Sequence, residues 1–116
     1  MAATAALYDR ALAAVKAVIP ETCKPGDKIG QCKAAYVVVY DGGMIPVSRA
    51  TGYRVIGVSA LVPKARHDEL GPLLKTASAA LATMGLKPRG SPGAEGVDPD
   101  YGACVQNIEY IAPCAL

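Results

Sequence analysis

The fold of this chain is decided by the stretch GYRVIGVSALVPKARHDELGPLLKTASAALATMGL, residues 52–86. β-branched and other apolar residues run from Tyr53 to Val62, which predicts a long strand. After Pro63 the apolar residues recur at spacings of three and four, and they are Leu70, Leu73, Leu74, Ala77, Leu81 and Met84. Residues with this spacing lie along one side of a helix, so we expect a helix with one face on a sheet.

Signals at both ends predict the extent of this helix. Pro72 is tolerated only in a first turn, where its missing N–H would have no partner within the helix. We therefore expect Asp68 or a neighbour to cap the start. Gly85 and Pro88 predict the end.

The N-terminal part predicts a helix, a connection and a second strand. Apolar residues spaced by three and four over residues 3–19 predict a helix that Pro20 ends. Glu21–Lys33 contains turn residues and predicts a connecting loop. Ala34–Tyr40 predicts a short strand with two apolar faces, typical of a strand covered by a helix on one face and by a helix or a neighbouring subunit on the other.

The segment DGGMIPVSRATG, residues 41–52, joins the two strands. We predict an antiparallel hairpin in which this segment is the tip, longer than the usual loop of about two to five residues. Met44, Ile45 and Val47 are apolar and costly to leave fully solvated. Long loops of this kind often serve in function or assembly, so we expect these three residues at an interface.

The C-terminal part predicts a loop and a closing strand. Lys87–Gly102 is dense in glycine and proline, and Ala103–Ala112 alternates as a strand does before Pro113 stops it. The whole chain, residues 1–116, is therefore expected to form one α+β domain in the order helix, strand, strand, helix, strand. Its sheet should be small, mainly antiparallel and packed by two helices.

Composition predicts a thin core. The 116 residues are 52% hydrophobic, with much alanine, and the 5% aromatic residues are all tyrosine. A core of this kind benefits from association with a partner surface. No run approaches the roughly 20 apolar residues of a membrane span, and the N-terminus lacks a basic leader. We expect a cytosolic protein that does not enter membranes.

Charge is segregated along the sequence, although the net charge of +2 is too small to indicate nucleic-acid binding. Residues 42–67 carry only bases, namely Arg49, Arg54, Lys64 and Arg66, and residues 90–116 carry only acids, namely Glu95, Asp98, Asp100 and Glu109. The basic segment of one copy could meet the acidic segment of another, or both could be solvated surface. The predicted interface residues are Met44, Ile45, Val47, Arg49, Arg54, Arg66, Asp98 and Asp100.

The sequence offers little for catalysis or cofactor binding. Cys23, Cys32, Cys104 and Cys114 are spaced too widely for a typical zinc site, and we expect free, partly buried thiols, with disulfides between the early and late pairs as the alternative. The single histidine, His67, stands beside Asp68 and is interpreted as a polar neighbour of the helix start rather than a proton shuttle. The glycines match no nucleotide motif, and the acids of residues 95–100 fall short of a calcium loop. No catalytic residue, cofactor or metal is predicted.

The order of elements resembles that of the small tail-completion proteins of long-tailed bacteriophages, the tail terminator and related neck proteins. The resemblance lies in an N-terminal amphipathic helix and in the segments AYVVVY, GYRVIGVSALVP, HDELGPLLKTASAALATMGL and ACVQNIEYIAP. It covers nearly the whole chain. The apolar, proline-bearing hairpin tip and the four cysteines depart from the family.

The resemblance implies a virion protein without catalytic activity, assembled in the host cytoplasm. Its subunits would form a ring, most often of six, on the head-proximal end of the tail tube. The ring would halt tube polymerisation and contact the head connector or a neck protein. DNA would pass through it without specific binding.

Two other classes remain open on the residues alone. A small enzyme or ligand-binding domain would need a pocket with convergent polar groups, for which His67 and the scattered cysteines offer little. A cytosolic adaptor of similar fold would be a monomer or dimer, and native mass distinguishes it from a ring.

Overall fold

The computed structural model describes the backbone of residues 2–28 and 30–115 and the side chains of residues 7–28 and 30–113. It confirms an α+β fold in which helices pack on a small, mainly antiparallel sheet. The elements in order are α1 (Ala2–Val18), β1 (Thr22–Cys23), β2 (Tyr36–Pro46), β3 (Thr51–Pro63), the 3-10 helix η1 (Lys64–Glu69), α2 (Leu70–Ala82), β4 (Lys87–Pro88), β5 (Gly96–Asp98) and β6 (Ala103–Ala115). The short strands β1, β4 and β5 lie in segments that were expected to be loops.

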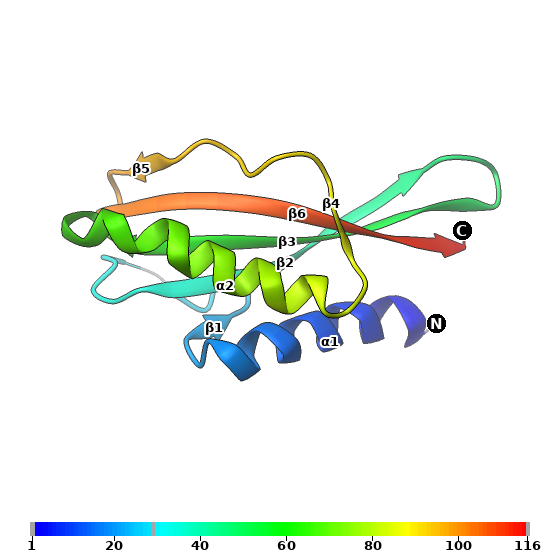
Figure 1. Cartoon of the computed structure of the whole chain (residues 1–116), viewed down its shortest axis with the longest axis horizontal. Helices are drawn as coiled ribbons and strands as arrows, with labels where there is room; N and C mark the ends of the chain where they lie inside the picture. Colours follow the sequence, from blue (N-terminus) through cyan, green and yellow to red (C-terminus); the bar gives the residue numbers. More distant parts are fainter. Residues whose placement is uncertain (1, 29, 116) are drawn as a thin grey trace.

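The sheet has the strand order β1-β2-β3-β6-β4, and β5 also pairs with β6 (Figure 1). Only the β1–β2 pairing is parallel. β3 is the central strand, with β2 on one side and β6 on the other. Both edges of β3 are paired within the subunit, so its backbone offers no free edge to a strand of a neighbouring subunit.

The main core lies between the helices and one face of the sheet. Its fully buried side chains include Ile56, Val58 and Val62 from β3 and Leu70 and Leu81 from α2. Leu74 and Ala77 are also buried, and Leu73 and Met84 are partly buried, which confirms the predicted apolar stripe. α1 adds Ala11 and Val15 to the same cluster. Both helices therefore cover a single face of the sheet.

The start of α2 differs from the prediction. The 3-10 helix η1 precedes it, and no side chain caps its N-terminus. Glu69, the residue before α2, instead accepts two hydrogen bonds from the Arg66 guanidinium, at 2.6 and 2.7 Å. Pro72 lies in the first turn and Gly85, at φ +81°, follows the end, as expected.

The hairpin tip is much shorter than the predicted segment of residues 41–52. β2 continues to Pro46 and β3 begins at Thr51, so the turn contains only residues 47–50. The Asp41-Gly42-Gly43 sequence, which resembles a turn, is a β-bulge. Gly43 has φ +87°, which favours glycine, and its N–H donates to Asp41 Oδ1 at 2.9 Å.

β6 continues past Pro113, which was expected to end it, and pairs with β3 as far as Ala115. Proline is tolerated where a strand edge is unpaired. Among the described residues, no strand pairs with the outer edge of β6 beyond Ile111. The C-terminal strand therefore runs beside the far end of the hairpin.

The sheet face away from the helices is covered only in part. At one end Tyr36, Leu61 and Ala103 form a small buried cluster, and Cys32 N–H donates to Tyr101 O at 2.7 Å, which holds the loop before β2 against it. Near the middle, Tyr40 crosses β3, and its hydroxyl lies 3.3 Å from Glu109 Oε2.

Gly57 of β3 makes room for Tyr40. A Cβ at position 57 would overlap the Tyr40 ring. We therefore expect Gly57→Ala to lower the free energy of unfolding by about 1–3 kcal/mol, because the ring must move and lose its hydrogen bonds. Urea denaturation measures this change. In a Tyr40→Ala background the same substitution should cost much less, and equal costs in both backgrounds would contradict this role of Gly57.

Candidate assembly interface

The arm is defined as residues 41–54, the outer part of the β2–β3 hairpin, and its tip projects beyond α1 and beyond the end of β6 (Figure 1). It contributes to the elongated shape of the molecule, which measures 47 × 25 × 24 Å. The predicted interface residues Met44, Ile45, Val47 and Arg49 all lie on it. Strand pairing positions Met44 and Ile45, and Val47 and Arg49 lie in the four-residue turn that follows.

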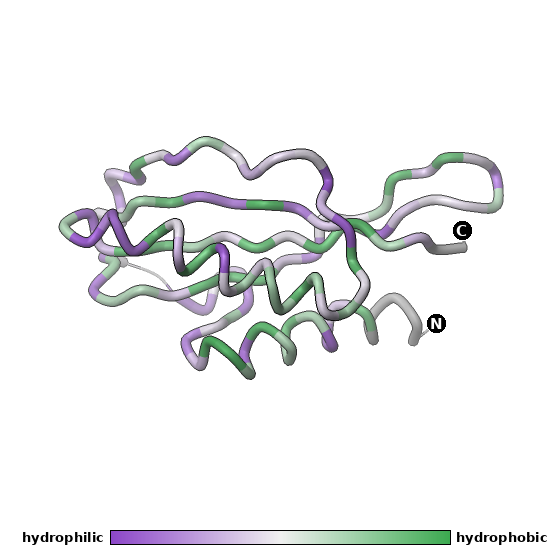
Figure 2. The backbone as a smooth tube through the Cα atoms, in the orientation of Figure 1, coloured by the Kyte–Doolittle hydropathy of each residue, from purple (hydrophilic) through white to green (hydrophobic). Residues whose placement is uncertain are grey.

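Apolar side chains of the arm reach solvent. Met44 is 41% exposed and Val47 is 64% exposed, whereas Ile45 is half-buried. Figure 2 shows hydrophobic positions along the outer part of β2 up to the turn, where a hydrophilic stretch begins. An apolar tip on a projecting element is unfavourable in water and favours contact with another surface.

The base of the arm is fixed to the rest of the subunit by polar contacts. Arg54 forms an ion pair with Asp41, and the Tyr8 hydroxyl of α1 donates to Val39 O at 2.7 Å. The Arg54 side chain is only 15% exposed. Arg54 was predicted as an interface residue, and within the subunit its charge is neutralised by Asp41, which lies just outside the basic segment.

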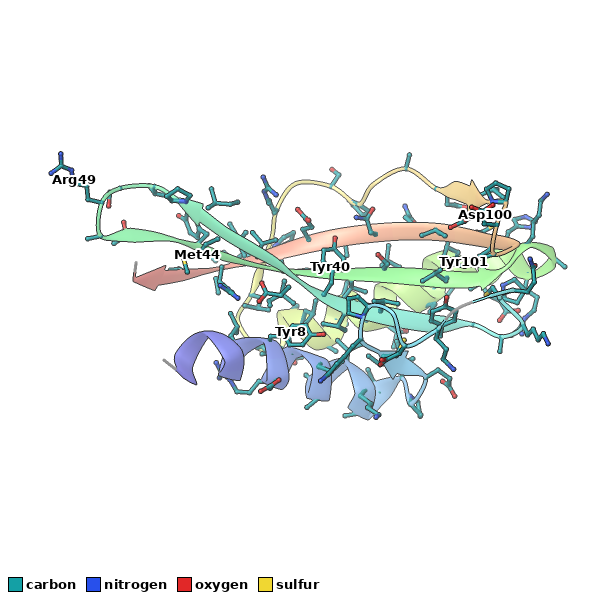
Figure 3. The ribbon with its side chains drawn as sticks, turned by 180° about the vertical axis from the view of Figure 1, so that it is seen from behind. Tyr8, Tyr40, Met44, Arg49, Asp100 and Tyr101 are labelled. Atoms are coloured by element: carbon teal, nitrogen blue, oxygen red, sulfur yellow. The ribbon has the colours of Figure 1, made fainter. Side chains whose placement is uncertain are left out.

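The other predicted residues lie at the opposite end of the molecule. In Figure 3 Arg49 marks the tip of the arm, and Asp100 and Tyr101 lie at the far end of the sheet. Asp98 belongs to β5 and Arg66 to η1, which follows β3. The structure therefore separates Arg66 from Arg49 and Arg54 and places it at the end that carries Asp98 and Asp100.

Intrachain pairing also reduces the predicted charge segregation. Arg66 pairs with Glu69, and Arg89 Nη1 lies 2.7 Å from Glu109 Oε1. The Arg66 guanidinium lowers the pKa of the exposed Glu69. Within the described part of the chain, Arg49, Asp98 and Asp100 have no ion pair. Of the predicted interface residues, Arg49 at the arm tip and Asp98 and Asp100 at the β5 turn therefore keep charges that no ion pair of the described chain neutralises.

A groove beside β5 was not predicted from the sequence. It has a volume of about 430 Å³ and is lined by Ala94, Gly96, Val97, Asp98, Pro99, Val105, Gln106 and Asn107. Val97 is 53% exposed. The groove exists because β5 pairs with β6, and this pairing brings Val97 opposite Cys104. An isolated valine within a Gly/Pro-rich segment was the one sequence signal for it.

The residues considered for chemistry are dispersed. His67 is exposed in η1. Cys23, Cys32 and Cys104 are free thiols, as expected, and the side chain of Cys114 lies outside the described residues. Burial raises the pKa of Cys23 and Cys32, opposite to the shift of an activated thiolate. Among the described residues no group of acids, histidines or cysteines could hold a metal ion.

Three tyrosines predict a loss of stability at alkaline pH. Burial raises the pKa of Tyr8, Tyr36 and Tyr40 in the folded chain. Because the folded state favours their neutral form, this stabilisation is complete below about pH 10, the pKa of an unfolded tyrosine, and is lost as the pH rises through the folded value. Tyrosinate absorbance should show midpoints above that of the urea-unfolded chain. Midpoints that coincide in the two states would contradict this.

Comparison with models of known protein families and with curated proteins found no match to this chain. No described helix has both the length and the apolar character needed to cross a membrane.

Proposed function

We propose that the chain is the subunit of a closed ring that ends a phage tail tube and joins it to the head connector. The observation that carries this proposal is the arm, a paired and ordered extension with exposed Met44 and Val47 at its outer part. The phage assignment comes from the resemblance in element order. The virion location and the tube and connector partners follow from it.

The small core supports an assembly role. The buried cluster contains no phenylalanine or tryptophan, since the chain has none. A subunit of this size gains stability when neighbours cover further apolar surface. Most soluble oligomers of identical subunits have closed symmetry, so we expect a ring rather than an open filament. The proteins that this chain resembles most often form rings of six subunits.

A tube-capping assay tests this function. Polymerising tail tube protein is mixed with the purified chain, and tube lengths are measured by electron microscopy. We expect shorter tubes with a ring at one end and tubes that accept head connectors. Tubes of unchanged length without an end ring, across a range of subunit ratios, would reject the proposal.

An enzyme is the second class that the residues left open, and His67 provides its test. His67→Ala should leave tail joining unchanged, because the side chain is exposed and lies in η1, at the other end of β3 from the arm. The assay is the yield of infectious particles from separated heads and tails. A folded, correctly assembled His67→Ala protein that fails to join tails would support the enzyme class instead.

A further inference from the structure

We infer that the arm tip of one subunit docks into the groove beside β5 of the next subunit. The contact would place Met44 and Val47 against Val97, and Arg49 beside the acids of the β5 turn. This inference rests on the ring of the proposed function and identifies the contact that closes it.

The arm is suited to docking by side chains rather than by strand addition. Its outer strand, β2, carries a bulge at residues 41–43 and ends at Pro46. Bulges and prolines on an edge strand hinder pairing with another strand. The exposed side chains at the tip therefore supply the contact, and Val47 is more exposed than Met44, the other large apolar one.

The groove offers a complementary surface. Val97 is apolar and 53% exposed, and Asp98 and Pro99 complete that part of the lining. Asp100 follows directly and is exposed. Arg49 has no ion pair among the described residues, and neither Asp98 nor Asp100 has one. Apolar contact at the centre with opposite charges at the rim is the usual arrangement of a specific interface.

The positions of the two surfaces identify the occupant as a second copy of this chain. The arm tip and the β5 turn lie at opposite ends of the long dimension of 47 Å (Figure 3). An arm therefore cannot reach the groove of its own subunit. A contact between different surfaces of identical subunits is head-to-tail, and it closes into a ring when the rotation between neighbours allows it.

Disulfide trapping tests the contact. The parent protein carries Cys23→Ser, Cys32→Ser, Cys104→Ala and Cys114→Ser, so that no native thiol competes. Cys104 in particular lies opposite position 97 in the sheet. One protein then receives Val47→Cys and a second, of different tag length, receives Val97→Cys. The matched control replaces the second protein by one with Thr76→Cys, which is exposed on α2. Mixtures are oxidised and the covalent dimers are quantified.

We expect the 47–97 dimer to exceed the 47–76 dimer by at least tenfold. Equal yields in a mixture that forms rings would overturn the inference and indicate that the arm docks elsewhere, for example on the tail tube. A strong 47–97 dimer in a protein that fails to cap tubes would support the contact and reject the tail function. A protein that caps tubes but gives no 47–97 dimer would support the tail function and reject the contact.

A charge exchange gives a second readout with the native cysteines in place. Arg49→Asp should raise the Kd for assembly up to about fivefold per contact at low salt, and Asp100→Arg in the same chain should restore it. Asp100 is chosen because Asp98 Oδ1 accepts the Asp100 N–H at 3.0 Å and shapes the turn. If the second substitution restores nothing, Arg49 does not face the β5 turn.

Discussion

Replacing Met44 and Val47 together by serine is expected to convert the ring into monomers without unfolding the subunit. Both side chains are exposed in the isolated chain, so the subunit loses little when they change. In the ring each would lose an apolar contact, and full burial of such a side chain contributes about 1.5–3 kcal/mol. Only the exposed 41% of Met44 and 64% of Val47 remains to be buried, so the Kd for assembly should rise roughly tenfold to a hundredfold per contact. Sedimentation velocity over a range of concentrations measures it.

Val18→Ser is the matched control for this experiment. Val18 is 53% exposed, like the arm residues, but it ends α1 and borders a groove between the two helices. The serine variant should assemble as the unchanged chain does. If Val18→Ser dissociates the ring and the arm variant does not, the interface lies between the helices and the arm has another role.

Leu81→Ala is expected to cost the largest share of subunit stability. Leu81 is a fully buried residue of α2, and deletion of a buried leucine side chain typically costs about 2–5 kcal/mol. Domains have a total stability of about 5–15 kcal/mol, and this core has no phenylalanine or tryptophan to compensate. We expect a loss of about 3 kcal/mol in urea denaturation.

The urea denaturation of Leu81→Ala is carried out in the Met44→Ser, Val47→Ser variant, where assembly does not add to the apparent stability. Leu81→Met, which conserves volume, should cost less than about 1.5 kcal/mol. A loss below about 1 kcal/mol for Leu81→Ala would contradict the packing of α2 on the sheet.

The parts of the fold that depend on local periodicity were predictable from the sequence. The stripe of α2 and the central strand were found because Leu70, Leu74 and Leu81 repeat at helical spacing and Tyr53–Val62 is rich in β-branched and other apolar residues. The hairpin was misjudged because Asp41-Gly42-Gly43 has the composition of a turn. A bulge needs the same residues, and only its pairing with Val55 and Ile56 distinguishes it from a turn.

The candidate interface was predictable only in part, because it depends on contacts between distant residues. The apolar residues of the arm were visible in the sequence. The Asp41–Arg54 ion pair and the groove formed by β5 on β6 were not, since strand register decides them. Charge counted along the chain also grouped Arg66 with Arg49, although η1 lies at the other end of β3.

The most direct test of ring formation is the native mass of the full chain in solution, alone and with tail tubes. We predict one assembled species whose mass is a fixed multiple of the subunit mass and does not grow with concentration, because a closed ring has no free end. A species that remains monomeric at tens of micromolar in both conditions would contradict ring assembly through the arm.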